Sequence, residues 1–340
     1  MQELTMTHVA ARTSIRSPNA LPSSLFALVL GLAGLGNAWR AARTVWPVPH
    51  VIGELFELLA AIVFVTLLAG YLPRLLRARS AERAELHHPL QASYVALVPV
   101  STLLMALAAL PYQRTLALAL FTLGALGALG YGVYRYGSLW LEDRADEQTT
   151  SALYLPTVAA SFVTANAAGA LGHVEIGWLF FGVGTFTWLA LESVILQRLL
   201  TRTLPPALRP SLGIHLAPPV VGAAAYLSLT DGRPDVFVQA MVGYGIFVAL
   251  TLLRLAPWLN VTGFAASYWS YTFGATALAY SLIRLHHAGL AGVYGPLAVL
   301  ALIAANVVVV GCALLTVRLW WQGRLVPNAA PPTGTLSEST

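Results

Sequence analysis

The stretch Leu-Leu-Ala-Ala-Ile-Val-Phe-Val at residues 58–65 contains no polar side chain and lies inside a longer apolar window, 52–77. A helix crosses the hydrocarbon core of a bilayer with about 20 mostly apolar residues, so this window predicts a membrane span. Of the 340 residues in the chain, 57% are hydrophobic and 10% are charged, whereas soluble domains carry about a quarter charged residues. The composition therefore excludes a soluble globular protein, a disordered protein and a nucleic-acid binder of the usual kind.

Windows like this one recur along the chain and are separated by polar segments or by segments rich in Pro and Gly. The expected spans are ten: 21–41, 52–77, 91–111, 114–136, 152–171, 175–200, 211–229, 236–256, 266–285 and 291–320. Only the segment 111–114 separates the third from the fourth, and a merged pair would give nine. Short connections predict antiparallel neighbours, that is, five tandem helical hairpins. Residues 1–20 are then a cytoplasmic N-terminal segment, 21–320 the transmembrane domain and 321–340 a disordered cytoplasmic tail.

The basic residues, all of them arginine, predict the orientation. With the N-terminus in the cytoplasm, 14 of the 19 arginines fall on the cytoplasmic side. The other five fall outside, namely Arg40, Arg43, Arg114, Arg233 and Arg284. This asymmetry obeys the positive-inside rule with both termini cytoplasmic, which requires an even number of spans and so favours ten over nine.

Odd-numbered and even-numbered spans differ in composition. Odd spans carry proline and small polar residues in the middle of the membrane, whereas even spans are smoother and richer in Leu, Val, Ala and Phe. Proline frees backbone carbonyls and kinks a helix, and freed groups need partners away from lipid. The pattern therefore predicts an inner ring of five odd helices around a central pore and an outer ring of five even helices. An uncharged inner ring would contact a solute weakly at several points, which suits conduction.

Three segments carry a family resemblance: ELHHPLQASY at 85–94 with VPVST at 98–102, LPPALRPSLGIHLAPP at 204–219, and YWSYTF at 268–273. They resemble helix signatures of the tellurite-resistance/dicarboxylate transporter family. That family includes the bacterial TehA proteins and is similar to plant slow anion channels and fungal malate permeases. The resemblance covers essentially 21–320. It implies five hairpins around a pore, a homotrimer with one pore per subunit, and a place in the bacterial inner membrane.

The resemblance also implies that Phe273, in the ninth span, blocks the pore. From the residues alone, a phenylalanine on a helix rich in Ser and Thr can have another role, which is to pack between helices. The candidate pore-lining residues are small, polar or helix-distorting positions on odd spans: Gly34, Pro99, Ser101, Pro156, Thr157, Ser161, Pro218, Val221, Gly274 and Thr276. Arg40 is the candidate anion-attracting residue of the vestibule, with an interfacial anchor as the alternative.

We expect the other ionisable residues within the spans to have structural roles. Glu54, Glu57 and Glu192 lie near the ends of even spans, where pairing with an arginine or reaching toward the interface is the preferred interpretation. His215, on an odd span, is expected to be a hydrogen-bonded core histidine. The lone cysteine, Cys312, excludes an intrachain disulfide and a cysteine-based metal site. We expect no metal and no cofactor, and the absence of paired carboxylates or a nucleophile motif argues against an enzyme.

Two functions remain. The first is a passive channel for small anions, embedded in the lipid bilayer and closed by Phe273. The alternative is a proton- or ion-coupled transporter of C4-dicarboxylates or tellurite. A carrier is expected to have a tight midplane site, often charged and built from inverted repeats. The spans expected to form the pore carry no charge in mid-membrane, which favours the channel.

Overall fold

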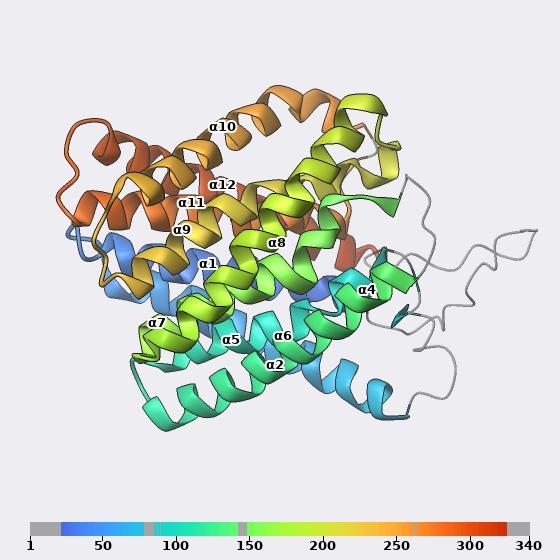
Figure 1. The fold of residues 1–340 in the computed structure, drawn as a ribbon, viewed down its shortest axis with the longest axis horizontal. Coiled ribbons are helices and arrows are strands. Elements are labelled where there is room, and N and C mark those ends of the chain that lie inside the picture. Colours follow the sequence, from blue (N-terminus) through green and yellow to red (C-terminus); the bar gives the residue numbers. More distant parts are fainter. Residues whose placement is uncertain are drawn as a thin grey trace, which may run out of the picture.

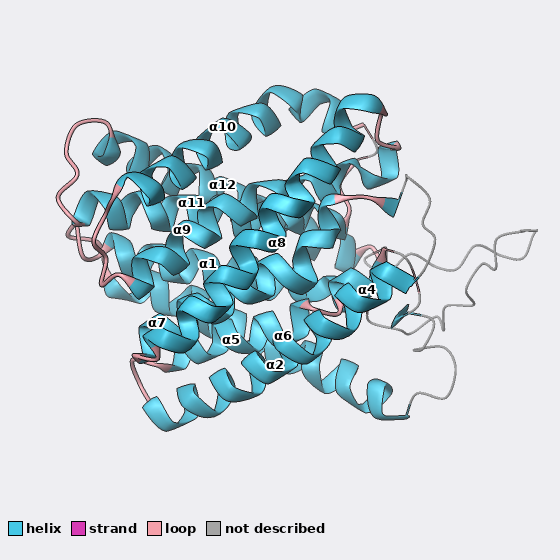
Figure 2. Ribbon diagram, in the orientation of Figure 1, coloured by secondary structure: helices cyan, strands magenta, loops and turns pink. Residues whose placement is uncertain are grey.

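The structure, a computed structural model of the chain, describes residues 22–77, 85–86, 88, 90–141, 148–261 and 263–324. All regular elements within these ranges are helices (Figure 2). The predicted segment 1–20 and most of the predicted tail, 325–340, lie outside them. Trp321, which the sequence placed at the start of the tail, is the last residue of a helix.

Five helices are long and continuous, and each has 24 to 28 residues. These long helices are α2 (His50–Arg77), α6 (Arg114–Leu141), α8 (Val174–Thr201), α10 (Val236–Leu259) and α12 (Tyr294–Trp321). At about 1.5 Å per residue, each exceeds the roughly 30 Å thickness of a hydrocarbon core. They coincide with the even-numbered windows, whose middle parts are runs of Leu, Val, Ala and Phe; the prolines inside α2 and α10, Pro73 and Pro257, lie in their last turns.

The other five helices, which we call the interrupted helices, each follow a short irregular segment. They are α1 (Ala27–Ala42), α5 (Leu97–Ala109), α7 (Ala160–Leu171), α9 (Ala217–Leu229) and α11 (Ser270–His287). The preceding segments are η1 (Ser23–Phe26), α4 (Gln91–Tyr94), η3 (Ser151–Leu153) with the π-helical η4 (Leu155–Ala159), η5 (Pro206–Leu216) and η6 (Ala266–Trp269). Pro156 and Pro210 lie inside two of these segments, where the missing N–H disfavours regular α-helix.

Eight helices in the described part of the chain are long and apolar enough to cross a membrane. The all-helical membrane architecture is therefore confirmed, whereas the count of ten spans stays a prediction. The two remaining windows correspond to α7 and α11. α7 itself has 12 residues, and α11 carries Arg284 and two histidines in its last turn.

Burial separates the two kinds of helix. In the spans that contain α1, α5 and α9, 72%, 61% and 89% of the most apolar window is buried. In the long helices the share is 22% to 28%. The long helices therefore expose most of their apolar surface, which is the pattern of a lipid-facing layer.

Packing follows the chain in hairpins, since each interrupted helix packs against the long helix that comes next. The interrupted helices also pack against one another in the order α1, α5, α7, α9, α11, and α11 returns to pack against α1 (Figure 1). This last contact joins segments at opposite ends of the chain. Gly34 permits it, because a Cβ at that position would run into the side chain of Thr276 on α11.

Candidate functional site

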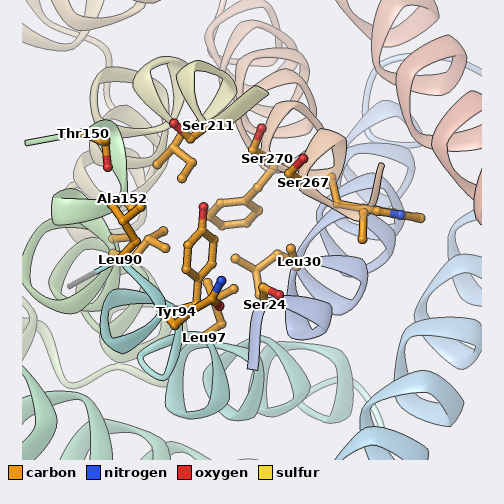
Figure 3. A pocket seen from close by; sticks show the side chains of 18 of the residues that line it. Ser24, Leu30, Leu90, Tyr94, Leu97, Thr150, Ala152, Ser211, Ser267 and Ser270 are labelled. Atoms are coloured by element: carbon orange, nitrogen blue, oxygen red, sulfur yellow. The ribbon is translucent and has the colours of Figure 1, made fainter. Parts of the chain in front are cut away.

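A cavity of about 180 Å³ lies among the irregular segments that precede the interrupted helices. We call it the Tyr94 cavity, after the tyrosine at the end of α4. Its polar lining comes from Ser24, Gln91, Tyr94, Thr150, Ser211, Ser267 and Ser270 (Figure 3). Leu, Ile, Ala, Trp and Phe side chains make up the rest, and none of the described residues in the lining is charged.

A second cavity, of about 340 Å³, lies toward the other end of the same helices. We call it the Arg284 cavity. Asn37 of α1, Asn166 of α7 and Ser228 of α9 are among its polar residues, and Asp231 and Arg284 are its charged ones. The Arg284 guanidinium donates to the Tyr280 hydroxyl at 3.1 Å.

Phe273, in the first turn of α11, is the one described residue that lines both cavities. Its ring also packs near α1, where a Cβ on Gly34 would lie 3.4 Å from the ring carbon Cδ2. Its carbonyl accepts a hydrogen bond from the Thr276 hydroxyl at 3.0 Å. The phenylalanine singled out by the sequence therefore lies where the two cavities meet.

The other predicted pore-lining residues divide into two groups. Gly34 and Val221 line the Arg284 cavity together with Phe273. Eight border neither cavity, namely Pro99, Ser101, Pro156, Thr157, Ser161, Pro218, Gly274 and Thr276. A Cβ on Gly274 would lie 2.9 Å from the Leu216 Cβ, so that glycine faces the junction of η5 and α9. The role of these eight residues in a pore stays a prediction.

Arg40 also borders neither cavity. Its Nε and Nη2 donate to the Glu54 carboxylate at 2.9 and 2.6 Å, and Glu57 lies 3.7 Å away. Tyr112, in the loop after α5, donates to Glu54 as well, and this hydrogen bond raises the pKa of Tyr112. The expected pairing of these acids with an arginine is confirmed. The sequence pattern offered Arg40 as the vestibule arginine, whereas the arginine that lines a cavity bordered by Phe273 is Arg284. Arg40 lines a separate pocket together with Glu54 and Glu57.

Glu192 of α8 is the centre of a buried polar cluster. One carboxylate oxygen contacts His215 Nε2 at 3.0 Å and accepts a hydrogen bond from Tyr244. The other oxygen accepts from Tyr154 at 2.6 Å and from Trp188 Nε1 at 2.9 Å. His215 is thus a hydrogen-bonded core histidine, as expected, although its partner is a carboxylate on a long helix. The cluster ties α8 and α10 to the segments that frame the Tyr94 cavity.

Sequence reasoning missed Tyr94 and Arg284 as cavity residues. Tyr94 lies inside the stretch at 85–94 and near the start of the third expected span, 91–111, where a tyrosine was a readable signal. Arg284 was counted only for topology, although a charge within an expected span is a functional candidate. Among the described residues, no group of three His, Cys, Asp or Glu side chains is placed to hold a metal ion.

Comparison with known proteins gives consistent matches along the chain. The model of the voltage-dependent anion channel family, SLAC1, matches residues 20–317. The Tellurite resistance protein TehA homolog of Haemophilus influenzae is 32% identical over 312 residues, which cover 92% of this chain and 94% of that protein. The S-type anion channel SLAH3 of Arabidopsis thaliana is 26% identical over 275 residues, which cover 77% of this chain and 42% of that protein. These matches, together with the helical membrane architecture, show that the chain is a multi-pass membrane protein of the voltage-dependent anion channel family.

Proposed function

We propose that this protein is an anion channel of the bacterial inner membrane. Small anions pass passively through a pore within each subunit, and the side chain of Phe273 closes that pore. The observation that carries the proposal is the position of Phe273 between the Tyr94 cavity and the Arg284 cavity. One side chain at such a junction can interrupt a path that is otherwise open.

The helix packing supports a pore enclosed by the interrupted helices. Because α1, α5, α7, α9 and α11 contact one another in a closed circuit, they form the inner ring, and the long helices form the outer one. All ten cross the membrane in this arrangement, with α7 and α11 shielded from lipid by their neighbours. Both termini are then cytoplasmic, so the Tyr94 cavity faces the cytoplasm and the Arg284 cavity faces outward.

The chemistry of the two cavities favours anions. The Tyr94 cavity has hydroxyl and amide groups, and the described residues of its lining include no acidic side chain that would repel a negative ion. At the outer mouth, Arg284 attracts anions, and Asp231 of the same lining offsets part of that attraction. Selectivity then follows the cost of dehydration, because the inner cavity has no fixed cation to strip water from a strongly hydrated anion.

A phenylalanine ring closes such a path by displacing water. An apolar constriction gates by dewetting, because an ion that enters it loses hydration and gains no polar contact. The ring of Phe273 has the bulk to fill the junction, and its neighbour Gly34 has no side chain that would compete for the space.

The test is a planar-bilayer recording of Phe273→Ala against the wild type in symmetrical chloride. We expect the variant to conduct many times more current, because removal of the ring joins the two cavities. Phe247→Ala is the matched control, since Phe247 of α10 is 64% exposed on the outside of the molecule. If Phe273→Ala assembles normally and conducts no more than the wild type, Phe273 is not the gate.

The homotrimer stays a prediction from the family resemblance. The long helices offer the surface for it, because large apolar side chains such as Leu123, Phe186 and Leu253 are exposed on them. Native mass spectrometry of the full chain in detergent should show three copies. A monomer under conditions that preserve activity would contradict the trimer and leave the pore of each subunit in place.

A further inference from the structure

The Tyr94 cavity offers hydrogen-bond donors, and the side chains that the structure describes around it are uncharged. We propose that it binds one partly dehydrated, monovalent inorganic anion, and that the Tyr94 hydroxyl is the main ligand that sets anion preference. The inference rests on the proposed function, because the site lies on the proposed path just inside Phe273. It adds a ligand site on that path.

The direction of the tyrosine side chain is the first observation. Figure 3 shows Tyr94 reaching from α4 into the middle of the cavity, with the hydroxyl oxygen at its tip. Within the described part of the chain, that hydroxyl makes no hydrogen bond to protein. A phenolic O–H is a good donor to an anion. An anion in the cavity would therefore find a donor that has no competing protein acceptor.

Thr150 supplies the second observation. This residue is 3% exposed, and its Oγ1 is buried without a hydrogen-bond partner among the described residues. Its side chain lines the same cavity, at the rim of the view in Figure 3. A buried hydroxyl without a partner costs free energy, which a bound acceptor would recover. The Gln91 side chain lines the cavity next to Tyr94 and adds a further amide.

Two other hydroxyls of the lining already donate hydrogen bonds within the protein. Ser211 donates to the Leu208 carbonyl at 2.7 Å, and Ser270 donates to the Pro210 carbonyl at 2.5 Å. Their protons are therefore unavailable to a ligand. The lining hydroxyls left without a hydrogen-bond partner among the described residues are those of Ser24, Tyr94, Thr150 and Ser267. Tyr94, which reaches into the middle of the cavity, and Thr150, whose hydroxyl is buried, are the test positions.

Size and charge define the ligand class. The cavity holds about 180 Å³, and a water molecule in the liquid occupies roughly 30 Å³. A halide or nitrate ion fits with several waters retained. A dicarboxylate carries two negative charges, for which the described lining offers no cation. Binding through neutral donors alone is weak, and weak binding lets the ion leave again, as conduction requires.

The experiment uses the purified full-length chain and chloride as the probe. Chloride binding is titrated by the broadening of the ³⁵Cl NMR line in the wild type and in Tyr94→Phe. A hydrogen bond to a charged group contributes enough that its loss should weaken the apparent affinity about tenfold. Tyr271→Phe is the matched control, because Tyr271 also has an unpartnered hydroxyl but borders neither cavity. It should stay within twofold of the wild type.

Three results would separate the possible outcomes. If Tyr94→Phe binds chloride within twofold of the wild type, the proposal is overturned. Should Tyr94→Phe fail to fold, Thr150→Val takes its place, with a severalfold weaker affinity expected and an unchanged one overturning the site. If Phe273→Ala carries no current while Tyr94→Phe still weakens binding, the channel proposal fails and the anion site stands.

Discussion

Replacement of Glu192 by leucine is the sharpest test of the packing around the proposed pore. The substitution removes the acceptor from four donors: His215, Tyr154, Trp188 and Tyr244. The Glu192 side chain is 12% exposed, so water can replace little of what the donors lose.

The expected loss of stability follows from the number of donors that lose their acceptor. A hydrogen bond between membrane helices contributes about 0.6 kcal/mol on average, and breaking a buried charged pair costs about 3–5 kcal/mol. Four donors around one carboxylate therefore lead us to expect a loss of about 3 kcal/mol in the free energy of unfolding. At about 2 °C per kcal/mol for a chain of this size, Tm should fall by about 6 °C.

The assay is thermal unfolding of purified protein in detergent, followed by the intrinsic fluorescence of its tryptophans. Glu175→Leu is the matched control, because Glu175 lies on the same helix and is exposed; its Tm should stay within about 2 °C of the wild type. Glu192→Gln keeps one acceptor oxygen, so its Tm should lie between the Tm values of Glu192→Leu and Glu175→Leu. A Tm for Glu192→Leu that equals that of Glu175→Leu would refute the reasoning.

Two further predictions concern the cavity mouth and the α1–α11 contact. In the Phe273→Ala background, Arg284→Gln should lower chloride conductance severalfold at 10 mM salt and leave it unchanged at 1 M, because the screening length falls from about 30 Å to about 3 Å. Arg40→Gln should show no such salt dependence, and equal effects of the two arginines would contradict the assignment. Gly34→Ala should lower Tm by several degrees through overpacking, whereas Gly311→Ala, with open space at its Cβ, should raise Tm slightly.

The sequence predicts the helices well because their signal is local. The window 52–77 corresponds to α2 at His50–Arg77, and the smooth windows as a group became the long helices. Proline and small polar residues correctly mark the helices that the structure interrupts and buries. The number of spans is harder to predict from the sequence. Whether α7 and α11 cross the membrane depends on packing against their neighbours more than on their own hydropathy.

The sequence does not predict how each helix is rotated about its own axis. Neighbouring residues on a helix point about 100° apart, so Phe273 can border both cavities while Gly274 packs against Leu216. The same limit explains the arginines. Arg40 and Arg284 both lie near the outer ends of expected spans, and only tertiary packing decides that one pairs with Glu54 while the other lines the Arg284 cavity.

The reversal potential of Phe273→Ala tests the central claim most directly. With a tenfold chloride gradient across the bilayer and equal pH on both sides, a passive anion pathway predicts a reversal potential close to the chloride equilibrium value, about 59 mV in magnitude. Imposing a pH gradient should leave that value unchanged. A reversal potential near zero, or one that follows the pH gradient as a proton-coupled carrier requires, would contradict passive anion conduction through a pore closed by Phe273.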